Sequence, residues 1–204
     1  VSPSVAGNRS LRIGVLALQG DVREHKLMLE QFDVDVVSVR RERELAQVDG
    51  LIIPGGESSV MDKLARIFDL FEPLKTSIRA GLPVFGTCAG LIMLADNILD
   101  AIDGQQSLGG LDVDVRRNAF GAQVDSFEVE VDAPAIAATP LAAAFIRAPV
   151  VERVGADVEV LAKLGDGRIV GVRQGNALGI SFHPEVSGEP RVHEFFLNIV
   201  RSAS

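Results

Sequence analysis

The single cysteine of this chain, Cys88, lies in the segment Gly86-Thr87-Cys88-Ala89-Gly90, between two apolar runs. Small residues on both sides of the cysteine allow the backbone to turn sharply from a strand into a helix, as it does around the nucleophile of many acyl-transfer enzymes. Such a turn directs the side chain into a cleft, and the start of a helix favours the thiolate form. A lone cysteine in an apolar stretch is often a buried structural residue, but that position has no need of flanking glycines. The segment therefore predicts a cysteine nucleophile.

A histidine and a glutamate near the end of the chain could activate this thiol. The apolar segment 177–182 is typical of a short strand, and it runs directly into His183-Pro184-Glu185, where the proline ends the strand. Alternation along an extended segment places His183 and Glu185 on the same side. The carboxylate can then orient the imidazole while the imidazole takes the thiol proton. A histidine at a strand end is by itself often only a surface residue, but together with Cys88 it predicts a Cys-His-Glu triad.

Backbone donors for a developing oxyanion are predicted in two turns. Residues 51–53 form an apolar segment that leads into Pro54-Gly55-Gly56-Glu57-Ser58 and then into a helix. An acyl-transfer nucleophile needs N–H groups where the oxyanion forms, and the amides of Gly56 and Ala89 are the candidates. The segment would suit an ordinary strand-to-helix turn capped by Ser58 equally well. Only the accompanying triad motifs favour the catalytic interpretation.

The elements that position these residues alternate between strand and helix in the first half of the chain. The patterns predict strands at 12–18, 34–39, 51–53 and 82–85, and helices at 22–32, 58–70 and 89–99. This repetition predicts a parallel sheet covered on both faces by helices, with the site at the carboxyl ends of the strands. The second half predicts half-exposed strands at 111–116 and 127–132, a hairpin at 158–172 and a closing amphipathic helix. The predicted fold class is α/β, a single domain with a mostly parallel, flavodoxin-like central sheet and added antiparallel strands.

Composition is typical of a cytoplasmic enzyme. A chain of 204 residues with 47% hydrophobic residues can bury a full core. A net charge of −8 argues against nucleic acid as a partner, because phosphate binding needs clustered Lys and Arg. One cysteine forms no internal disulfide, no apolar run approaches the roughly twenty residues of a membrane span, and the three histidines lack metal-ligand spacing. Residues 1–10 are expected to form a disordered tail and residues 11–204 the domain.

In this order, the motifs resemble those of class I, triad-type glutamine amidotransferases, and most closely those of the glutaminase subunits of pyridoxal 5'-phosphate synthase. The sharp turn around Cys88, called the elbow below, and the His-Pro-Glu segment are shared by many amidotransferases. The segments that narrow the resemblance to this family are residues 18–25, 117–121 and 145–149. It extends from Leu11 to about Val200. The resemblance implies hydrolysis of L-glutamine to L-glutamate and ammonia through a γ-glutamyl thioester on Cys88, without a cofactor or a metal.

The resemblance also implies which residues bind the substrate and the partner. The glutamine-binding positions of the family fall on Gly56, Glu57, Ser58, Arg117, Ile146 and Arg147. A guanidinium can pair with the α-carboxylate of glutamine, although a single arginine is more often a solvated surface charge. The implied partner is the barrel subunit of the synthase in a large hetero-oligomer. In the family, the loop Gln19-Gly20-Asp21 lies near both the oxyanion hole and the partner surface.

Dependence on that partner is a further expectation. Free ammonia is lost to water and to protonation, so a glutaminase is expected to dock to the subunit that receives the ammonia. The hypothesis is that docking reorients the Gly55–Gly56 peptide so that a backbone N–H faces the oxyanion, which glycine permits at little steric cost. The chain alone would then be a poor glutaminase.

Two other functions remain open. One is another enzyme on the same sheet, such as the glutaminase of histidine biosynthesis or a cysteine hydrolase, and residues 117–121 and 145–149 argue against it. The other is a non-catalytic regulatory module that has kept the fold. A broken triad would mark such a module, and Cys88, His183 and Glu185 are all present.

Overall fold

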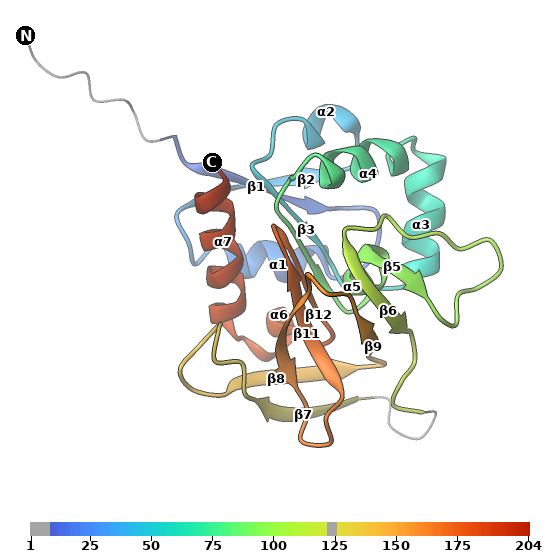
Figure 1. Ribbon diagram of the computed structural model, residues 1–204. Helices are drawn as coiled ribbons and strands as arrows, with labels where there is room; N and C mark the ends of the chain where they lie inside the picture. Colours follow the sequence, from blue (N-terminus) through green and yellow to red (C-terminus); the bar gives the residue numbers. More distant parts are fainter. Residues whose placement is uncertain (1–8, 122–125) are drawn as a thin grey trace, which may run out of the picture.

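A ten-stranded sheet forms the centre of the molecule (Figure 1), and a separate two-stranded sheet lies beside it. The computed structural model describes residues 9–121 and 126–204, so most of the expected N-terminal tail lies outside the described residues. The strands of the large sheet are β1 (Leu11–Leu16), β2 (Val34–Val39), β3 (Gly50–Ile53), β4 (Val84–Thr87), β5 (Ala95–Ile98), β6 (Leu111–Arg116), β9 (Val150–Val154), β10 (Glu159–Lys163), β11 (Ile169–Gln174) and β12 (Ala177–Ile180). Their order is β2-β1-β3-β4-β12-β11-β9-β6-β5, with β10 paired to β11. The small antiparallel sheet consists of β7 (Ser126–Val131) and β8 (Leu141–Ile146).

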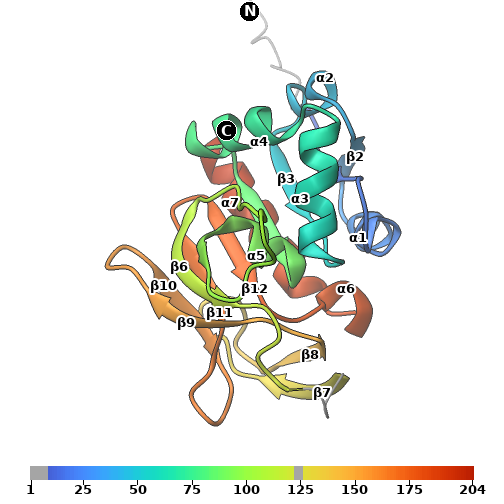
Figure 2. The ribbon, with the colours of Figure 1, turned by 90° about the vertical axis from the view of Figure 1, so that its right-hand side faces the viewer.

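In the sheet order, the five strands β2, β1, β3, β4 and β12 pair in parallel with one another. Most of the other pairs in this sheet are antiparallel. Helices cover both faces of this sheet, as Figures 1 and 2 show. The helices are α1 (Val22–Leu29), α2 (Glu42–Leu45), α3 (Ser58–Ile67), α4 (Phe71–Arg79), α5 (Ala89–Leu94), α6 (Pro184–Ser187) and α7 (Pro190–Ala203). The predicted α/β class with helices on both faces is confirmed.

Two apolar clusters form the core, one on each face. Neighbouring residues of β3 divide between them: Leu51 packs with α3, α4 and α5, whereas Ile52 packs with α1 and α7. This alternation follows from the two-residue period of a strand that is buried on both sides. In the described residues, no helix combines the length and the apolar character that crossing a membrane requires.

The predicted helix at 89–99 is too long. It ends at Leu94, and the next four residues form β5, which pairs with β6. Asp96 and Asn97 are weak helix formers, and in the strand their side chains have partners. The Asn97 amide donates to Asp114 Oδ1 at 3.3 Å, and Asp96 Oδ1 accepts from the Gly110 N–H at 3.4 Å. Tertiary pairing therefore outweighs the apolar pattern at this point.

The parallel register brings the ends of three strands together. Ile53 of β3 lies opposite Gly86 of β4, and Thr87 of β4 lies opposite Ile180 of β12. The segments that follow these strands therefore leave the sheet at one edge, where ligands of open α/β sheets usually bind.

Candidate active site

A cleft of about 380 Å³ opens at this edge of the sheet. All the site residues predicted from the sequence line it except Gly20, Ala89 and Glu185. Two further residues, Ile92 and Asn118, line it without having been predicted. The complete lining is Gln19, Asp21, Gly56, Glu57, Ser58, Cys88, Ile92, Arg117, Asn118, Ile146, Arg147 and His183.

Cys88 lies in the predicted sharp turn between β4 and α5. Its backbone has φ +50° and ψ −103°, a strained conformation for a residue with a side chain that costs of order 1–3 kcal/mol. The turn is held by the Cys88 N–H, which donates to the Ile180 carbonyl at 2.8 Å. The flanking glycines are required sterically, since a Cβ on Gly90 would lie 2.1 Å from the Ile53 carbonyl oxygen. The cysteine is only 6% exposed, and that exposure is toward the cleft.

His183 and Glu185 lie beside each other, as the sequence predicts. His183 Nδ1 donates to Glu185 Oε1 at 2.7 Å, and both side chains are buried. Burial lowers the pKa of His183, but its contacts with Asp21, Cys88 and Glu185 outweigh burial and raise this pKa from 6.5 to about 12. Burial raises the pKa of Glu185, and the hydrogen bond from His183 opposes that shift. A protonated imidazole beside the thiol favours a thiolate–imidazolium pair, which can attack a carbonyl and then protonate a leaving amine.

A second carboxylate, which the sequence did not assign to the imidazole, also faces His183. Asp21 Oδ2 lies 3.2 Å from His183 Nδ1. The ligand atoms of Asp21, His183 and Glu185 lie within 4.8 Å of one another, the spacing of a possible metal site. A metal would hold each ligand atom at about 2.0–2.2 Å, whereas the contact between His183 and Glu185 is a direct hydrogen bond. The cluster is therefore suited to orienting the imidazole.

The loop after β1 fixes the peptide that was predicted to supply an oxyanion donor. The Gly55 carbonyl accepts from the Asp21 N–H at 2.9 Å, and the Glu57 N–H donates to Gln19 Oε1 at 2.9 Å. A Cβ on Gly20 would lie 1.9 Å from the Gly55 oxygen, so only glycine permits this approach. In a trans peptide the C=O and the N–H point in opposite directions. The loop therefore sets the direction of the Gly56 N–H.

The lining of the cleft carries both signs of charge. Arg117 Nη2 lies 2.8 Å from Glu57 Oε1, and the buried Arg117 Nε has no hydrogen-bond partner among the described residues. Arg147 follows β8 with a φ of +44°, a strained conformation that directs it to the cleft. A carboxylate and two guanidinium groups match the ammonium and carboxylate groups of an α-amino acid.

The start of α3 differs from the sequence interpretation in one detail. The cap of this helix is Glu57, whose carboxylate accepts from the Ser59 N–H at 3.4 Å and the Ser59 hydroxyl at 3.0 Å. Ser58 is instead the first helical residue, and its hydroxyl accepts from Gln105 Nε2 at 2.9 Å. Ser58 still lines the cleft.

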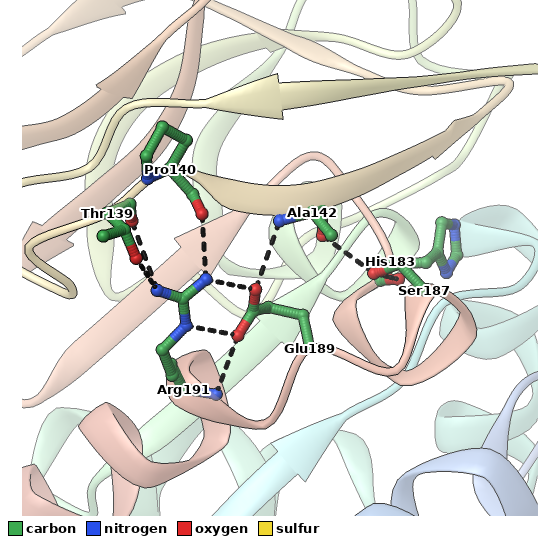
Figure 3. A network of polar contacts seen from close by, with 7 residues as sticks. All are labelled: Thr139, Pro140, Ala142, His183, Ser187, Glu189 and Arg191. Carbon is green, nitrogen blue, oxygen red and sulfur yellow. Dashed lines mark hydrogen bonds and ion pairs between the residues drawn. The ribbon is translucent and has the colours of Figure 1, made fainter.

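His183 and Glu185 lie in a turn that a network of polar contacts attaches to the small sheet (Figure 3). The His183 N–H donates to the Ala144 carbonyl at 2.8 Å, and the Ser187 hydroxyl donates to the Ala142 carbonyl at 2.8 Å. Beyond this turn, Glu189 caps α7 and binds Arg191 at 2.7 Å, and the hydrogen bond from Arg191 lowers the pKa of Glu189. The position of the imidazole therefore depends on β8 as well as on β12.

Sequence analysis missed a buried polar cluster behind Glu185. It consists of His25 on α1, Thr87 at the end of β4 and His193 on α7, all fully buried. One signal was available for His25. It shares the helical spacing of Val22 and Leu29, and a residue at that spacing faces the core. Nothing in the sequence pattern pairs it with His193.

Comparisons with known proteins show the family of this chain. Residues 15–202 match the family model of the SNO glutamine amidotransferase family. Two similar relatives, both named pyridoxal 5'-phosphate synthase subunit PdxT, come from Leifsonia xyli subsp. xyli and Clavibacter sepedonicus. The first is 62% identical over 188 residues, which cover 92% of this chain and 95% of that protein. The second is 58% identical over 202 residues, which cover 99% of this chain and 96% of that protein.

Solved structures are also similar to this chain. A crystal structure described as a glutamine amidotransferase has 46% sequence identity and a TM-score of 0.86, covering 92% of this chain and 98% of that chain. A structure of PurLQS from Thermotoga maritima has 18% identity and a TM-score of 0.67, covering 93% of this chain and 99% of that one, and it shares the fold alone. Because the family model spans nearly all of the described residues and the relatives match almost end to end, this chain belongs to the SNO glutamine amidotransferase family.

Proposed function

We propose that this amidotransferase is the glutaminase subunit of a pyridoxal 5'-phosphate synthase. It hydrolyses L-glutamine to L-glutamate and ammonia in the cytoplasm, and it passes the ammonia to the barrel subunit of the synthase. One observation carries the catalytic part of the proposal: the strained Cys88 shares a cleft with His183, whose Nδ1 is bound by Glu185 at 2.7 Å. The names of the relatives support the choice of partner.

In the proposed reaction, the Cys88 thiolate attacks the γ-carbonyl carbon of glutamine. The N–H groups of Gly56 and Ala89 stabilise the resulting oxyanion, and His183 gives its proton to the amide nitrogen so that ammonia leaves. The remaining γ-glutamyl thioester is attacked by a water molecule that His183 deprotonates. Glutamate then leaves, and the thiolate is restored. Glu185 keeps the imidazole oriented throughout and stabilises its protonated form.

The charged residues of the cleft hold the α-amino acid group in this proposal. Glu57 takes the ammonium, while Arg117 and Arg147 take the α-carboxylate. The existing ion pair between Arg117 and Glu57 supports this assignment, because each partner can turn to the opposite charge of the substrate without leaving the cleft. Ser58 and Ile146 line the same cleft and would contact the aliphatic part of glutamine.

Alanine in place of Arg117 or Arg147 is expected to raise the KM for glutamine by roughly 10- to 150-fold, with a smaller change in kcat. The reason is that a charge-assisted hydrogen bond contributes about 1.5–3 kcal/mol and is made equally in the ground and transition states. Steady-state kinetics at saturating partner measure the effect. Arg43→Ala removes an exposed guanidinium that does not line the cleft, so it is the control and keeps the wild-type KM. An unchanged KM in both cleft variants would show that the carboxylate is bound elsewhere.

Covalent trapping tests the proposed function directly. A glutamine analogue that carries a diazoketone at the γ-position is expected to alkylate Cys88 with loss of dinitrogen, and mass spectrometry of the peptide containing residue 88 detects the adduct. Excess L-glutamine should slow the labelling of Cys88. Without added glutamine, the His183→Ala variant should also be labelled more slowly than the unmodified chain. Labelling at another residue, or labelling that glutamine does not slow, contradicts the proposal.

A further inference from the structure

Behind the proposed triad, two histidines from distant parts of the chain form a buried pair. His25 Nδ1 lies 2.9 Å from His193 Nε2, and both residues are fully buried. The Phe85 ring closes one side of the pair, with its centroid 5.4 Å from that of His193 in an edge arrangement. On its other side, His25 Nε2 lies 3.1 Å from the Thr87 hydroxyl and 3.6 Å from Glu185 Oε1. The histidine pair therefore lies next to the carboxylate of Glu185, which binds His183.

The surroundings of both histidines favour their neutral forms. Burial holds the pKa of His25 well below 6.5, and the neighbouring imidazoles of His193 and His183 lower this pKa further. Burial lowers the pKa of His193 to about 3. A neutral imidazole carries one N–H, so each ring has one donor and one acceptor nitrogen. Within the pair, one ring must donate to the other.

The unpaired nitrogen of His193 decides the direction of that hydrogen bond. His193 Nδ1 is buried and has no partner among the described residues. If His25 donated, the proton of His193 would lie on this nitrogen as an unsatisfied buried donor. In addition, the lone pair of His25 Nε2 would face the Glu185 carboxylate. If His193 donates, only a lone pair is left unsatisfied, which is the less costly arrangement. Donation from His193 to His25 is therefore favoured.

His25 then carries its proton on Nε2 and directs it at Thr87 and Glu185. We infer that His25 is a positioning residue for the glutaminase reaction, with an Nε2–H that His193 fixes in place and that keeps the Glu185 carboxylate ionised opposite His183. At 3.6 Å this N–H acts on Glu185 Oε1 through its dipole, while its direct hydrogen bond is to the Thr87 hydroxyl. The inference rests on the proposed roles of His183 and Glu185.

The charges around Glu185 give this dipole its importance. The titratable groups that face the carboxylate are His183 from its own turn, Asp21 from the loop before α1 and His25 from α1, with His193 of α7 behind His25. Asp21 and burial both favour the neutral form of Glu185, and His183 opposes them. Glu185 Oε2 has no partner among the described residues. An N–H dipole directed at the carboxylate therefore supports the ionised form, which the imidazolium of His183 requires.

Two substitutions of His25 test the inference in the complex with the synthase subunit. His25→Leu fills the space without an N–H donor. We expect it to lower kcat about tenfold at an unchanged KM. The acid limb of the pH profile of kcat should move up by about 0.5–1 pH unit, because Glu185 becomes easier to protonate. His25→Gln offers an amide N–H near the position of Nε2 and should retain the wild-type limb and a kcat within about threefold of wild type. Leu29→Ala, a core substitution on the same helix, should lower the Tm without moving the limb.

The outcomes separate this inference from the proposed function. If Cys88→Ser is inactive while His25→Leu keeps the wild-type kcat and acid limb, the proposed function stands and the inference is wrong. If Cys88→Ser remains active, the proposed function fails first. The inference is also wrong if His25→Gln behaves like His25→Leu, or if Leu29→Ala moves the limb. Should His25→Leu fail to fold, nitrogen-15 NMR of the histidines in the unmodified chain decides. It should show the Nε2–H tautomer for both His25 and His193, and the Nδ1–H tautomer at either residue overturns the inference.

Discussion

Replacing Cys88 with alanine or serine is expected to lower kcat for glutamine hydrolysis by about 10⁴-fold or more while leaving the fold and partner binding intact. Alanine removes the nucleophile altogether. Serine keeps a hydroxyl of similar size, but that hydroxyl does not ionise beside an imidazolium as a thiol does. Both replacements keep a Cβ, so the strained backbone of the elbow is affected equally in each. Ammonia release by the complex with the synthase subunit measures the effect.

The partners of the thiol should follow a graded order. His183→Ala removes the acid and base of every step and should be about as damaging as the loss of Cys88, since residues that act as a unit are not additive. Glu185→Gln keeps a hydrogen-bond acceptor beside Nδ1 but removes the negative charge, so some activity should remain. Unfolding temperature and binding to the synthase subunit are the controls. Ammonia release near the wild-type rate from a Cys88 variant contradicts the triad, and an unaffected Glu185→Gln removes only Glu185 from it.

The first half of the fold was predictable because its strands are buried on both faces. β3 and β4 are completely buried, so each is a short apolar run that ends in glycine-containing turns. The later half gave weaker signals. β8 has the sequence Leu-Ala-Ala-Ala-Phe-Ile, in which the alanines favour a helix, and only pairing with β7 makes it a strand. α4, a helix of nine residues, was not predicted. Pro73 lies in its first turn, where proline is tolerated, although the same residue in a sequence usually indicates the end of a helix.

The site divides in the same way. Cys88 and His183 follow neighbouring strands and have local turn motifs, so local sequence was sufficient to bring them together. The contact of Asp21 with His183 depends on how the loop after β1 lies across the cleft. The pair of His25 and His193 joins residues that are 168 positions apart and arises only when α1 and α7 pack on the same face of the sheet. Such contacts follow from tertiary packing, which no local pattern describes.

Adding the synthase subunit is expected to raise kcat for glutamine hydrolysis by roughly 10²- to 10³-fold, the effect of gaining one oxyanion donor. In the free chain the Gly55 carbonyl is held by the Asp21 N–H at 2.9 Å, and this hydrogen bond sets the direction of the Gly56 N–H. Docking at the loop of residues 19–21 would release the Gly55 carbonyl. Rotation of the Gly55–Gly56 peptide would then turn the Gly56 N–H toward the γ-carbonyl oxygen, on which the oxyanion forms. Ammonia release by the chain with and without the synthase subunit measures the activation. Equal rates would show that the partner does not switch the site.

A pair of substitutions at Asp21 separates this peptide switch from other modes of activation. Asp21→Pro removes the N–H that holds the Gly55 carbonyl, and the φ of −78° at Asp21 suits proline. Asp21→Ala is the matched control, because it also loses the carboxylate beside His183 but keeps the N–H. The free Asp21→Pro chain should hydrolyse glutamine faster than the free Asp21→Ala chain, and the partner should stimulate it less. If the partner stimulates both variants by the same factor, activation does not depend on the hydrogen bond between Asp21 and Gly55, and rotation of this peptide is not the switch.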